Sequence, residues 1–143
     1  MYRRRNFEVE VFLVHPGGPF WAKKDLGAWS IPKGEYFDDE DPLEVAKREF
    51  EEETGFAPKG NFIELGDLKQ PGGKIVTVWA FEGDCDPKKL KSNTFTMAWP
   101  PRSGRQIEAP EVDRGCWYSV TDARPRLLAG QRAFIDRLVE RVP

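Results

Sequence analysis

Apolar and polar residues alternate in several short stretches of this chain, which is the pattern of half-buried β-strands. The first stretch is FEVEVFLV at residues 7–14, where Glu8 and Glu10 interrupt a run of β-branched and aromatic residues. A second run covers residues 62–68, and the turn sequence QPGGK connects it to a β-type run at residues 75–81. This pair of runs predicts a β-hairpin.

Three shorter runs predict further strands, at residues 20–23, 94–99 and 115–120. Residues 100–114 are rich in proline and arginine, so we expect an irregular connection there. His15 follows the first strand and is expected to lie in a turn.

Helical periodicity is clearest in residues 42–54, where Leu43, Ala46 and Phe50 form an apolar stripe. Gly55 supplies the left-handed residue that ends many helices. Pro42 suits the first helical position. The acidic residues that can cap this first turn are Asp38, Asp39 and Asp41.

A second helical region begins near residue 121. Asp122 is its expected N-cap, and Leu127 and Leu128 are expected in a first helical segment. A second segment follows with an apolar face made of Phe134, Ile135, Leu138 and Val139. Strands with one early helix and late helices predict an α+β or three-layer α/β/α fold.

Composition favours one domain covering residues 1–143, with enough hydrophobic residues (39%) for a sizeable core. The 22 basic residues balance 24 acidic ones, which excludes a general nucleic-acid-binding protein. No stretch is long and apolar enough for a membrane span. Cys85 and Cys116 lack metal-ligand spacing and are expected to be buried or incidental thiols in a reducing cytosol. We therefore expect a cytoplasmic protein.

Acidic residues are concentrated in one place, because ten of the 24 lie between residues 35 and 53. On a helix, Glu49, Glu52 and Glu53 share one face, since residues three and four apart are neighbours. Arg48 lies one turn before Glu52 and can hold its carboxylate. Clustered carboxylates are the ligands that Mg²⁺ or Mn²⁺ requires, and Mg²⁺ commonly bridges to substrate phosphates. The cluster predicts metal-assisted phosphate chemistry.

Residues 34–56 also match a known motif in order and spacing. The nine matching positions are Gly34, Glu40, Arg48, Glu49, Phe50, Glu52, Glu53, Gly55 and Phe56. With this motif the chain resembles the Nudix hydrolases, and its lead-in HPGGPFWAKKDLGAWSIPKGE resembles a bacterial subgroup of that family. The resemblance implies an α/β/α sandwich with a mixed central sheet. It also implies hydrolysis of a nucleoside diphosphate linked to another group, with Mg²⁺ or Mn²⁺ as cofactor.

The resemblance assigns roles to individual residues. Metal ligands would be Glu52 and Glu53, with Glu49 binding or assisting and a backbone carbonyl near Gly34 completing the shell. Arg48 would orient the glutamates, and Glu40 would brace the loop by pairing with a basic residue. The attacking water would be activated by Glu52 or Glu53, or else by Glu111 in APEVDRGCW, which is otherwise an exposed loop residue.

Substrate contacts lie outside the motif. Basic residues that could neutralise phosphates are Lys23, Lys24 and Lys33 before the motif, and Arg102 and Arg105 after it, although each is also compatible with a solvated surface position. Trp29, Trp79 and Trp99 offer faces for a nucleobase, but aromatic residues in strand patterns usually belong to the core.

The substrate is left open among nucleoside triphosphates, dinucleoside polyphosphates, ADP-ribose and nucleotide sugars. Pro71 lies at an offset that the family associates with ADP-ribose cleavage, whereas IPKGE resembles the lead-in of hydrolases acting on dinucleoside polyphosphates and inositol pyrophosphates. A nucleotide-sensing Nudix-fold module without turnover is the alternative. The expected partner is a small diphosphate-containing molecule, and the protein is expected to be a monomer or homodimer.

Overall fold

The structure, a computed structural model, describes residues 1–33 and 39–142. The strands in this part of the chain are β1 (Tyr2–Arg5), β2 (Glu8–Pro16), β3 (Ile63–Lys69), β4 (Ile75–Ala80), β5 (Thr94–Ala98), β6 (Gln106–Pro110) and β7 (Val112–Ser119). The helices are α1 (Pro42–Thr54), α2 (Val120–Arg126) and α3 (Arg132–Arg141), with the 3₁₀ turns η1 (Pro87–Lys89) and η2 (Ala129–Gln131).

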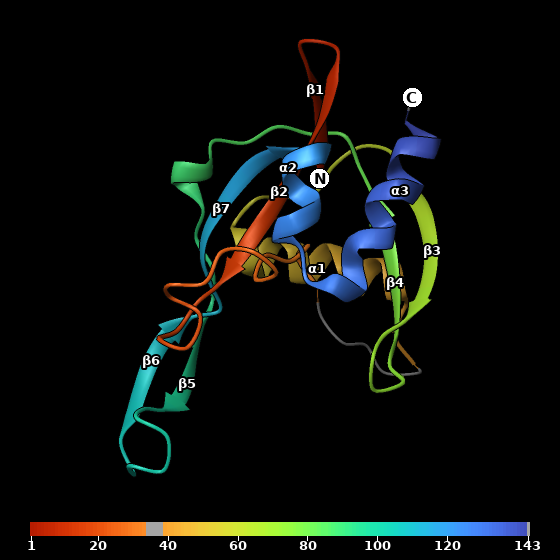
Figure 1. Cartoon of the computed structure of the whole chain (residues 1–143). Coiled ribbons are helices and arrows are strands. Elements are labelled where there is room, and N and C mark those ends of the chain that lie inside the picture. Colours follow the sequence, from red (N-terminus) through yellow and green to blue (C-terminus); the bar gives the residue numbers. More distant parts are fainter. Residues whose placement is uncertain (34–38, 143) are drawn as a thin grey trace.

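Three antiparallel units make up the β structure. The order β1-β2-β7 forms the central sheet, while β3-β4 and β5-β6 are separate hairpins. Isolated parallel bridges also join Tyr2 to Glu82 and Trp29 to Leu127, whereas the paired strands themselves are antiparallel. The β5-β6 hairpin extends away from the body of the molecule (Figure 1). The α+β fold predicted from the sequence is confirmed.

Strand β2 carries the centre of the fold because both of its faces are covered. Val11 and Leu13 belong to the core cluster that includes side chains of α2 and α3. Phe12 and Val14 point to the opposite face and pack in a second cluster with Trp117 and Phe56. This two-sided burial explains why residues 11–14 are continuously apolar instead of alternating. Figure 1 shows α2 in front of β2 and β7, α3 beside the β3-β4 hairpin, and α1 behind the central sheet.

Helix α1 has the predicted bounds and caps. The Asp41 side chain accepts a hydrogen bond from the Leu43 amide at 3.2 Å, and Gly55 ends the helix with φ 78°. Phe50 is buried against Phe81, with ring centroids 5.1 Å apart. Leu43 and Ala46, predicted to share this apolar face, are half-buried. The helix is therefore anchored by Phe50 together with Val45 and Thr54, which are also buried.

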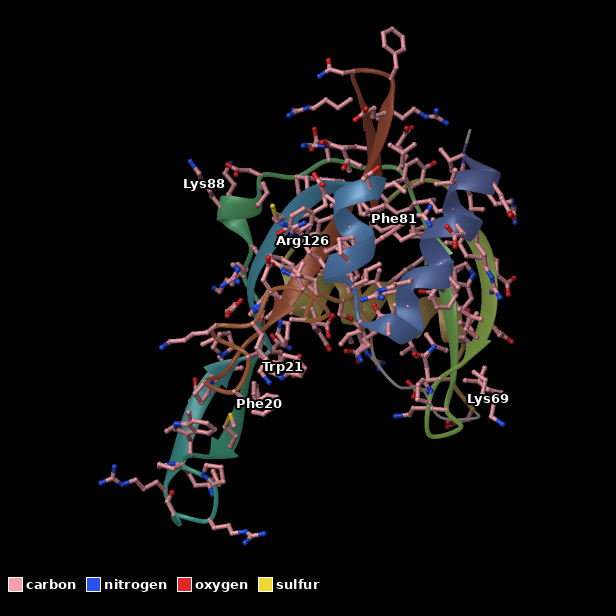
Figure 2. All side chains as sticks on the ribbon, in the orientation of Figure 1. Phe20, Trp21, Lys69, Phe81, Lys88 and Arg126 are labelled. Carbon is pink, nitrogen blue, oxygen red and sulfur yellow. The ribbon has the colours of Figure 1, made fainter. Side chains whose placement is uncertain are left out.

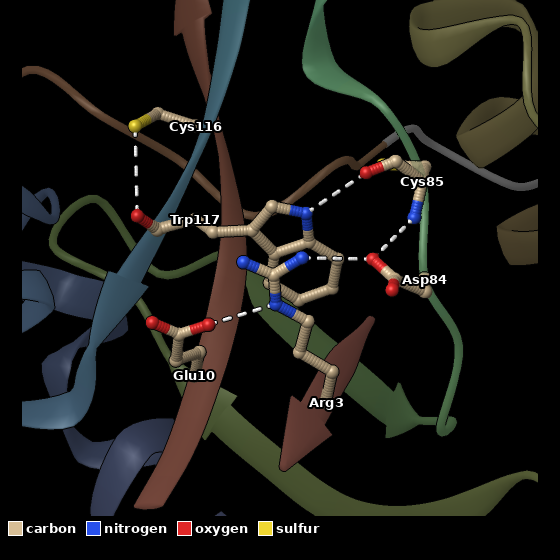
Figure 3. Close-up of polar contacts among 6 residues, drawn as sticks. All are labelled: Arg3, Glu10, Asp84, Cys85, Cys116 and Trp117. Carbon is tan, nitrogen blue, oxygen red and sulfur yellow. Dashed lines mark hydrogen bonds and ion pairs between the residues drawn. The ribbon is translucent and has the colours of Figure 1, made fainter. Parts of the chain in front are cut away.

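The N-terminal segment is a hairpin, although its sequence was interpreted as a single strand. Asn6 and Phe7 form the turn between β1 and β2, both with positive φ, as two-residue hairpin turns require. On β1, Arg3 donates to Glu10 at 2.7 Å and to Asp84 at 2.8 Å, and its guanidinium lies 4.2 Å from the ring centroid of Trp117 (Figure 3). These contacts fasten β1 to β2 and to the segment that contains Asp84.

The two cysteines are half-buried rather than fully enclosed. The Cys85 carbonyl accepts a hydrogen bond from the Trp117 indole at 3.2 Å, and the Cys116 thiol donates to the Trp117 carbonyl at 3.5 Å (Figure 3). Burial, with the charge of Asp84, raises the pKa of the Cys85 thiol to about 11. A thiol that stays protonated at neutral pH is a weak nucleophile.

Three predictions about the β structure require correction. Residues 20–23 form turns instead of a strand. Residues 100–114 are not an irregular connection, because they contain β6 and the first residues of β7. Strand β6 forms by pairing with β5, where Met97 lies opposite Ile107, and local composition does not report such a partner. The strand predicted at residues 115–120 is β7, which begins earlier and gives way to α2 at Val120.

The C-terminal prediction also needs correction. The N-cap of α2 is Ser119, whose hydroxyl accepts a hydrogen bond from the Asp122 amide at 3.2 Å. Leu127 and Leu128 lie after the end of α2 and not within it. Leu127 is buried and forms a parallel β-bridge with Trp29. Of the residues predicted on the apolar face of α3, Val139 is 40% exposed and the other three are buried. No helix among the described residues is long and apolar enough to cross a membrane.

Candidate functional site

The motif glutamates lie along one side of α1. The side chains of Glu49 and Glu52 are 20% and 40% exposed, and Glu53 is half-buried. One Glu53 carboxylate oxygen accepts a hydrogen bond from the Lys33 backbone amide at 2.9 Å. Lys33, which directly precedes the motif, is thereby hydrogen-bonded to helix α1 through the Glu53 side chain.

A chain of backbone hydrogen bonds brings Glu111 to the same site. The Asn93 amide donates to the Glu52 carbonyl at 2.9 Å, and the Glu111 amide donates to the Asn93 carbonyl at 2.8 Å. The Gly17 amide then donates to the Glu111 carbonyl at 3.0 Å. Glu111 is the residue between β6 and β7, so the turn at this junction carries an exposed acid towards α1.

The electrostatics show that these acids act on one another. Burial, with a smaller contribution from the charges of Glu111 and Glu49, raises the pKa of Glu53 to about 7 despite the opposing hydrogen bond from the Lys33 amide. Burial also raises the pKa of Glu49, with Glu52 and then Glu111 adding to the effect. Carboxylates that repel one another at close range favour a bound cation. The geometry thus gathers four acids from two separate parts of the chain.

Arg48 lies among the motif acids. Its guanidinium is 3.3 Å from the Glu40 carboxylate, 3.8 Å from Glu49 and 3.9 Å from Glu52. The sequence suggested that Arg48 pairs with Glu52 and that Glu40 pairs with a basic residue, and the structure places all of these groups together. Because the Arg48 side chain is 51% exposed, these ion pairs add little to the stability of the fold.

The remaining predicted site residues lie in different parts of the fold. Lys33 has an exposed side chain next to Glu53, whereas Lys23 is exposed on the loop that follows β2. Arg105 lies near the tip of the β5-β6 hairpin, which extends away from α1 (Figure 1). The carbonyl predicted near Gly34 falls outside the described residues. Trp29 is buried and belongs to the core, as the pattern favoured.

Sequence reasoning missed Asn93 and Gly17, which hold Glu111 beside α1. Both act through backbone groups, so no side-chain pattern identifies them. Asn93 and Ser92 also line an open cavity of about 770 Å³ next to Glu52 and Arg48. The Ser92 hydroxyl accepts a hydrogen bond from the Val112 amide at 3.0 Å, which fixes the start of β7.

The donor set fits a hard divalent cation. Carboxylate oxygens are the right ligand chemistry, and the neighbouring acids contribute, after burial, to the raised pKa values of Glu49 and Glu53. Within the described residues, no three acidic, histidine or cysteine side chains are placed so that they could hold a metal ion by themselves. Mg²⁺ commonly takes only one or two protein carboxylates and completes its shell with water and phosphate oxygens, so an open arrangement suits it.

We expect the metal-free protein to lose stability as the pH rises from about 4.5 to about 7. The folded pKa of Glu53 is about 7, above its ordinary value of 4.5, so the folded state binds this proton more tightly. The stabilisation is complete below the unfolded pKa and disappears as the pH rises through the folded pKa, with an upper limit of about 3 kcal/mol. Urea unfolding with a chelator, at several pH values, measures this change.

Glu53→Gln is the control for the pH effect, because it removes the titrating group with little change of shape. Its free energy of unfolding should depend less on pH over the same interval. Equal pH dependence in both proteins would contradict the assignment to Glu53.

Gly17→Ala should displace Glu111. A Cβ atom at Gly17 would lie 1.9 Å from the Pro110 carbonyl oxygen, so the junction of β6 and β7 must move. Overpacking of this kind costs about 1–3 kcal/mol. Urea unfolding measures the loss. Gly83→Ala is the control, because its Cβ would meet the flexible end of Met1, and a comparable loss there would argue against a specific clash at Gly17.

Solved structures with the same fold include three informative ones. The NUDIX domain of Shewanella oneidensis NrtR, complexed with ADP ribose, has a TM-score of 0.66 and 18% identity, and the match covers 99% of this chain and 83% of that one. A C. elegans Ap4A hydrolase in a binary complex has a TM-score of 0.68 and 18% identity, covering 99% and 92%. A mutT/nudix family protein from Listeria innocua has a TM-score of 0.59 and 15% identity, covering 99% and 88%. Comparison with curated protein sequences finds no significant match.

The layered α+β fold, with its acidic helix beside the central sheet, defines the Nudix structural class. The sequence agrees with this classification, because the family model of the NUDIX domain matches residues 2–138. The chain belongs to the NUDIX domain family.

Proposed function

We propose that this protein is a divalent-metal-dependent pyrophosphohydrolase that cleaves a diphosphate linkage in a nucleoside diphosphate joined to another group. The observation that carries the proposal is the gathering of Glu49, Glu52, Glu53 and Glu111, whose mutual repulsion a cation and its phosphate ligand would relieve. The complete motif and the family membership support it.

Glu49 and Glu52, with Glu53 once it is ionised, supply the oxygens that would hold Mg²⁺ or Mn²⁺. Such an ion, when bound, neutralises charge that develops on the phosphate oxygens. Arg48 keeps Glu49 and Glu52 in their orientations through contacts at 3.8 and 3.9 Å, and Glu40 in turn holds Arg48. The side chains therefore divide into donors of ligand oxygens and groups that align them.

Glu53 is the leading candidate to accept the proton of the attacking water. A general base works best when its pKa lies near the working pH, and in the metal-free protein the pKa of Glu53 is about 7. The Lys33 amide fixes one of its oxygens, which leaves the other free to face the water. Glu111 is the second candidate, because it is exposed and its charge acts on Glu53. Lys33 and Lys23 would neutralise substrate phosphates.

The test is hydrolysis of a substrate panel with and without Mg²⁺. The panel contains nucleoside triphosphates, dinucleoside polyphosphates, ADP-ribose and nucleotide sugars, and phosphate-containing products are separated by ion-exchange chromatography. We expect Mg²⁺-dependent cleavage of at least one member. Cleavage that is equally fast with a chelator would overturn the metal requirement.

A nucleotide-binding module without turnover is the second candidate function. The structure of the NrtR NUDIX domain with ADP ribose shows that a protein of this fold is found in complex with such a ligand. Calorimetric titration of the same panel distinguishes the two functions. Tight binding of one nucleotide, with no cleavage of any panel member, would favour the binding module.

A further inference from the structure

His15 is the single histidine of the chain, and its side chain is fully buried. The structure places it inside β2, beside a register shift between His15 and Pro16, and not in the turn that the sequence suggested. The proposed reaction does not use this side chain. A buried ionisable group of this kind needs a structural explanation.

Both ring nitrogens of His15 face hydrogen-bond acceptors. Nδ1 lies 2.9 Å from a carboxylate oxygen of Asp113, and Nε2 lies 2.6 Å from the backbone carbonyl oxygen of Lys24. A neutral imidazole carries one N–H, so one nitrogen lone pair would face an oxygen lone pair at hydrogen-bond distance. The imidazolium cation donates to both oxygens and leaves no buried polar atom unpaired.

The charged groups around the ring are compatible with a cation. Asp113 supplies the opposing negative charge, while the Lys24 ammonium is turned away and lies 3.7 Å from the centroid of Phe20. The Trp29 ring stands edge-on to His15 at 5.1 Å, and the Arg114 guanidinium lies 5.3 Å from the Trp29 centroid.

Acidic charge also lies on the far side of Trp29. Its indole donates to Asp25 at 2.7 Å, and Arg126 lies 3.6 Å from the same carboxylate. Arg114 is therefore separated from His15 by the Trp29 ring, and Arg126 is paired with Asp25. Asp113 is the charged group that directly contacts the histidine.

The two partners of His15 come from segments that border the acidic site. Lys24 lies in the loop of residues 17–27, which begins with the Gly17–Glu111 hydrogen bond. Asp113 follows Glu111 by two positions on β7. Figure 2 shows Phe20 and Trp21 on this loop near the β5-β6 hairpin, and Gly18 lies close to Phe95 and Met97 of β5. His15 thus joins the middle of the loop to the strand that starts beside Glu111.

We propose that His15 is a positioning residue that, as an imidazolium cation between Asp113 and the Lys24 carbonyl, fastens the 17–27 loop to β7 and so places Lys23 and Glu111 around the substrate phosphates. The structural part of this inference stands by itself, and its kinetic consequence rests on the proposed function. When the bridge is broken, the loop separates from β7, so substrate binding should suffer more than the chemical step.

The first experiment observes the ring directly. Because the chain has one histidine, a ¹H–¹⁵N correlation spectrum of the uniformly labelled protein at neutral pH contains one imidazole. We expect two ring nitrogens with similar shifts, both of the protonated type. Two widely separated shifts, which indicate a neutral tautomer, would overturn the proposal.

The second experiment removes the negative charge of one partner without touching the core. Asp113→Asn keeps the shape of a side chain that is 27% exposed, and its neutral amide oxygen is a weaker acceptor for the imidazolium than the carboxylate is. Trypsin should cleave after Lys23 or Lys24 on the order of tenfold faster, because the loop is released. Asp122→Asn, at an exposed acid in the first turn of α2, is the matched control. Unchanged cleavage in Asp113→Asn would refute the bridge.

The third experiment measures kinetics on whichever panel substrate is cleaved. Asp113→Asn should raise KM on the order of tenfold while kcat changes less, and His15→Gln, which keeps a donor towards Lys24, should give a smaller rise. A fall in kcat alone would overturn the positioning role. If no substrate is cleaved, the proposed function fails, whereas the spectrum and the proteolysis still decide the bridge.

Discussion

Glu53→Gln should lower Mg²⁺-dependent turnover by roughly 10²–10⁴-fold, the range typical for loss of a general base. The substitution keeps the size of the side chain and its acceptor for the Lys33 amide, which lies 2.9 Å from the carboxylate. It removes the charge that would bind a cation and accept a proton. The measurement is kcat on the panel substrate that the unaltered protein cleaves fastest.

Stability separates this loss from unfolding. Burial raises the pKa of Glu53 to about 7, so an uncharged glutamine should make the metal-free protein as stable as before, or more stable, at pH values above neutrality. Glu51→Gln is the matched control, because Glu51 is exposed, points away from Glu53 around α1 and should keep nearly full activity. Full activity in Glu53→Gln, or an equal loss in Glu51→Gln, would refute the assignment.

Phe50→Ala is expected to destabilise the protein by about 3–5 kcal/mol, the usual cost of removing a buried phenylalanine side chain. Phe50 is 6% exposed and makes an edge-to-face contact with Phe81. Because this contact anchors the helix that carries the motif glutamates, activity should fall together with the fraction of folded protein. Urea unfolding gives the free energy.

Two controls test whether burial at this position causes the effect. Phe50→Leu retains most of the apolar volume and should cost much less than alanine. Val139→Ala removes an apolar side chain that is 40% exposed on α3, and its expected cost is small. If Val139→Ala lowered the free energy of unfolding as much as Phe50→Ala does, burial of Phe50 would not be the cause of the effect.

Helix α1 could be predicted well because its signals are local. The Asp41 cap, the apolar stripe and Gly55 all lie within the helix or next to it, and the structure has the predicted bounds. The β3-β4 hairpin was predictable for the same reason, since its turn sequence connects two adjacent runs. Local signals also led to errors. The turns at residues 20–23 have a β-like composition but form no strand, because composition does not reveal whether a pairing partner is present.

The sequence alone determined the family motif, the helix that carries it and the side of that helix on which Glu49, Glu52 and Glu53 lie, because a regular helix fixes these relations over one or two turns. Only the tertiary structure decided that Glu111 joins them, since its position depends on backbone bonds to Asn93 and Gly17 that close long loops. It also decided that His15 is buried between an acceptor on the nearby loop, Lys24, and one on the distant strand β7, Asp113. Contacts of this kind depend on how separate elements pack, and no local pattern of side chains encodes them.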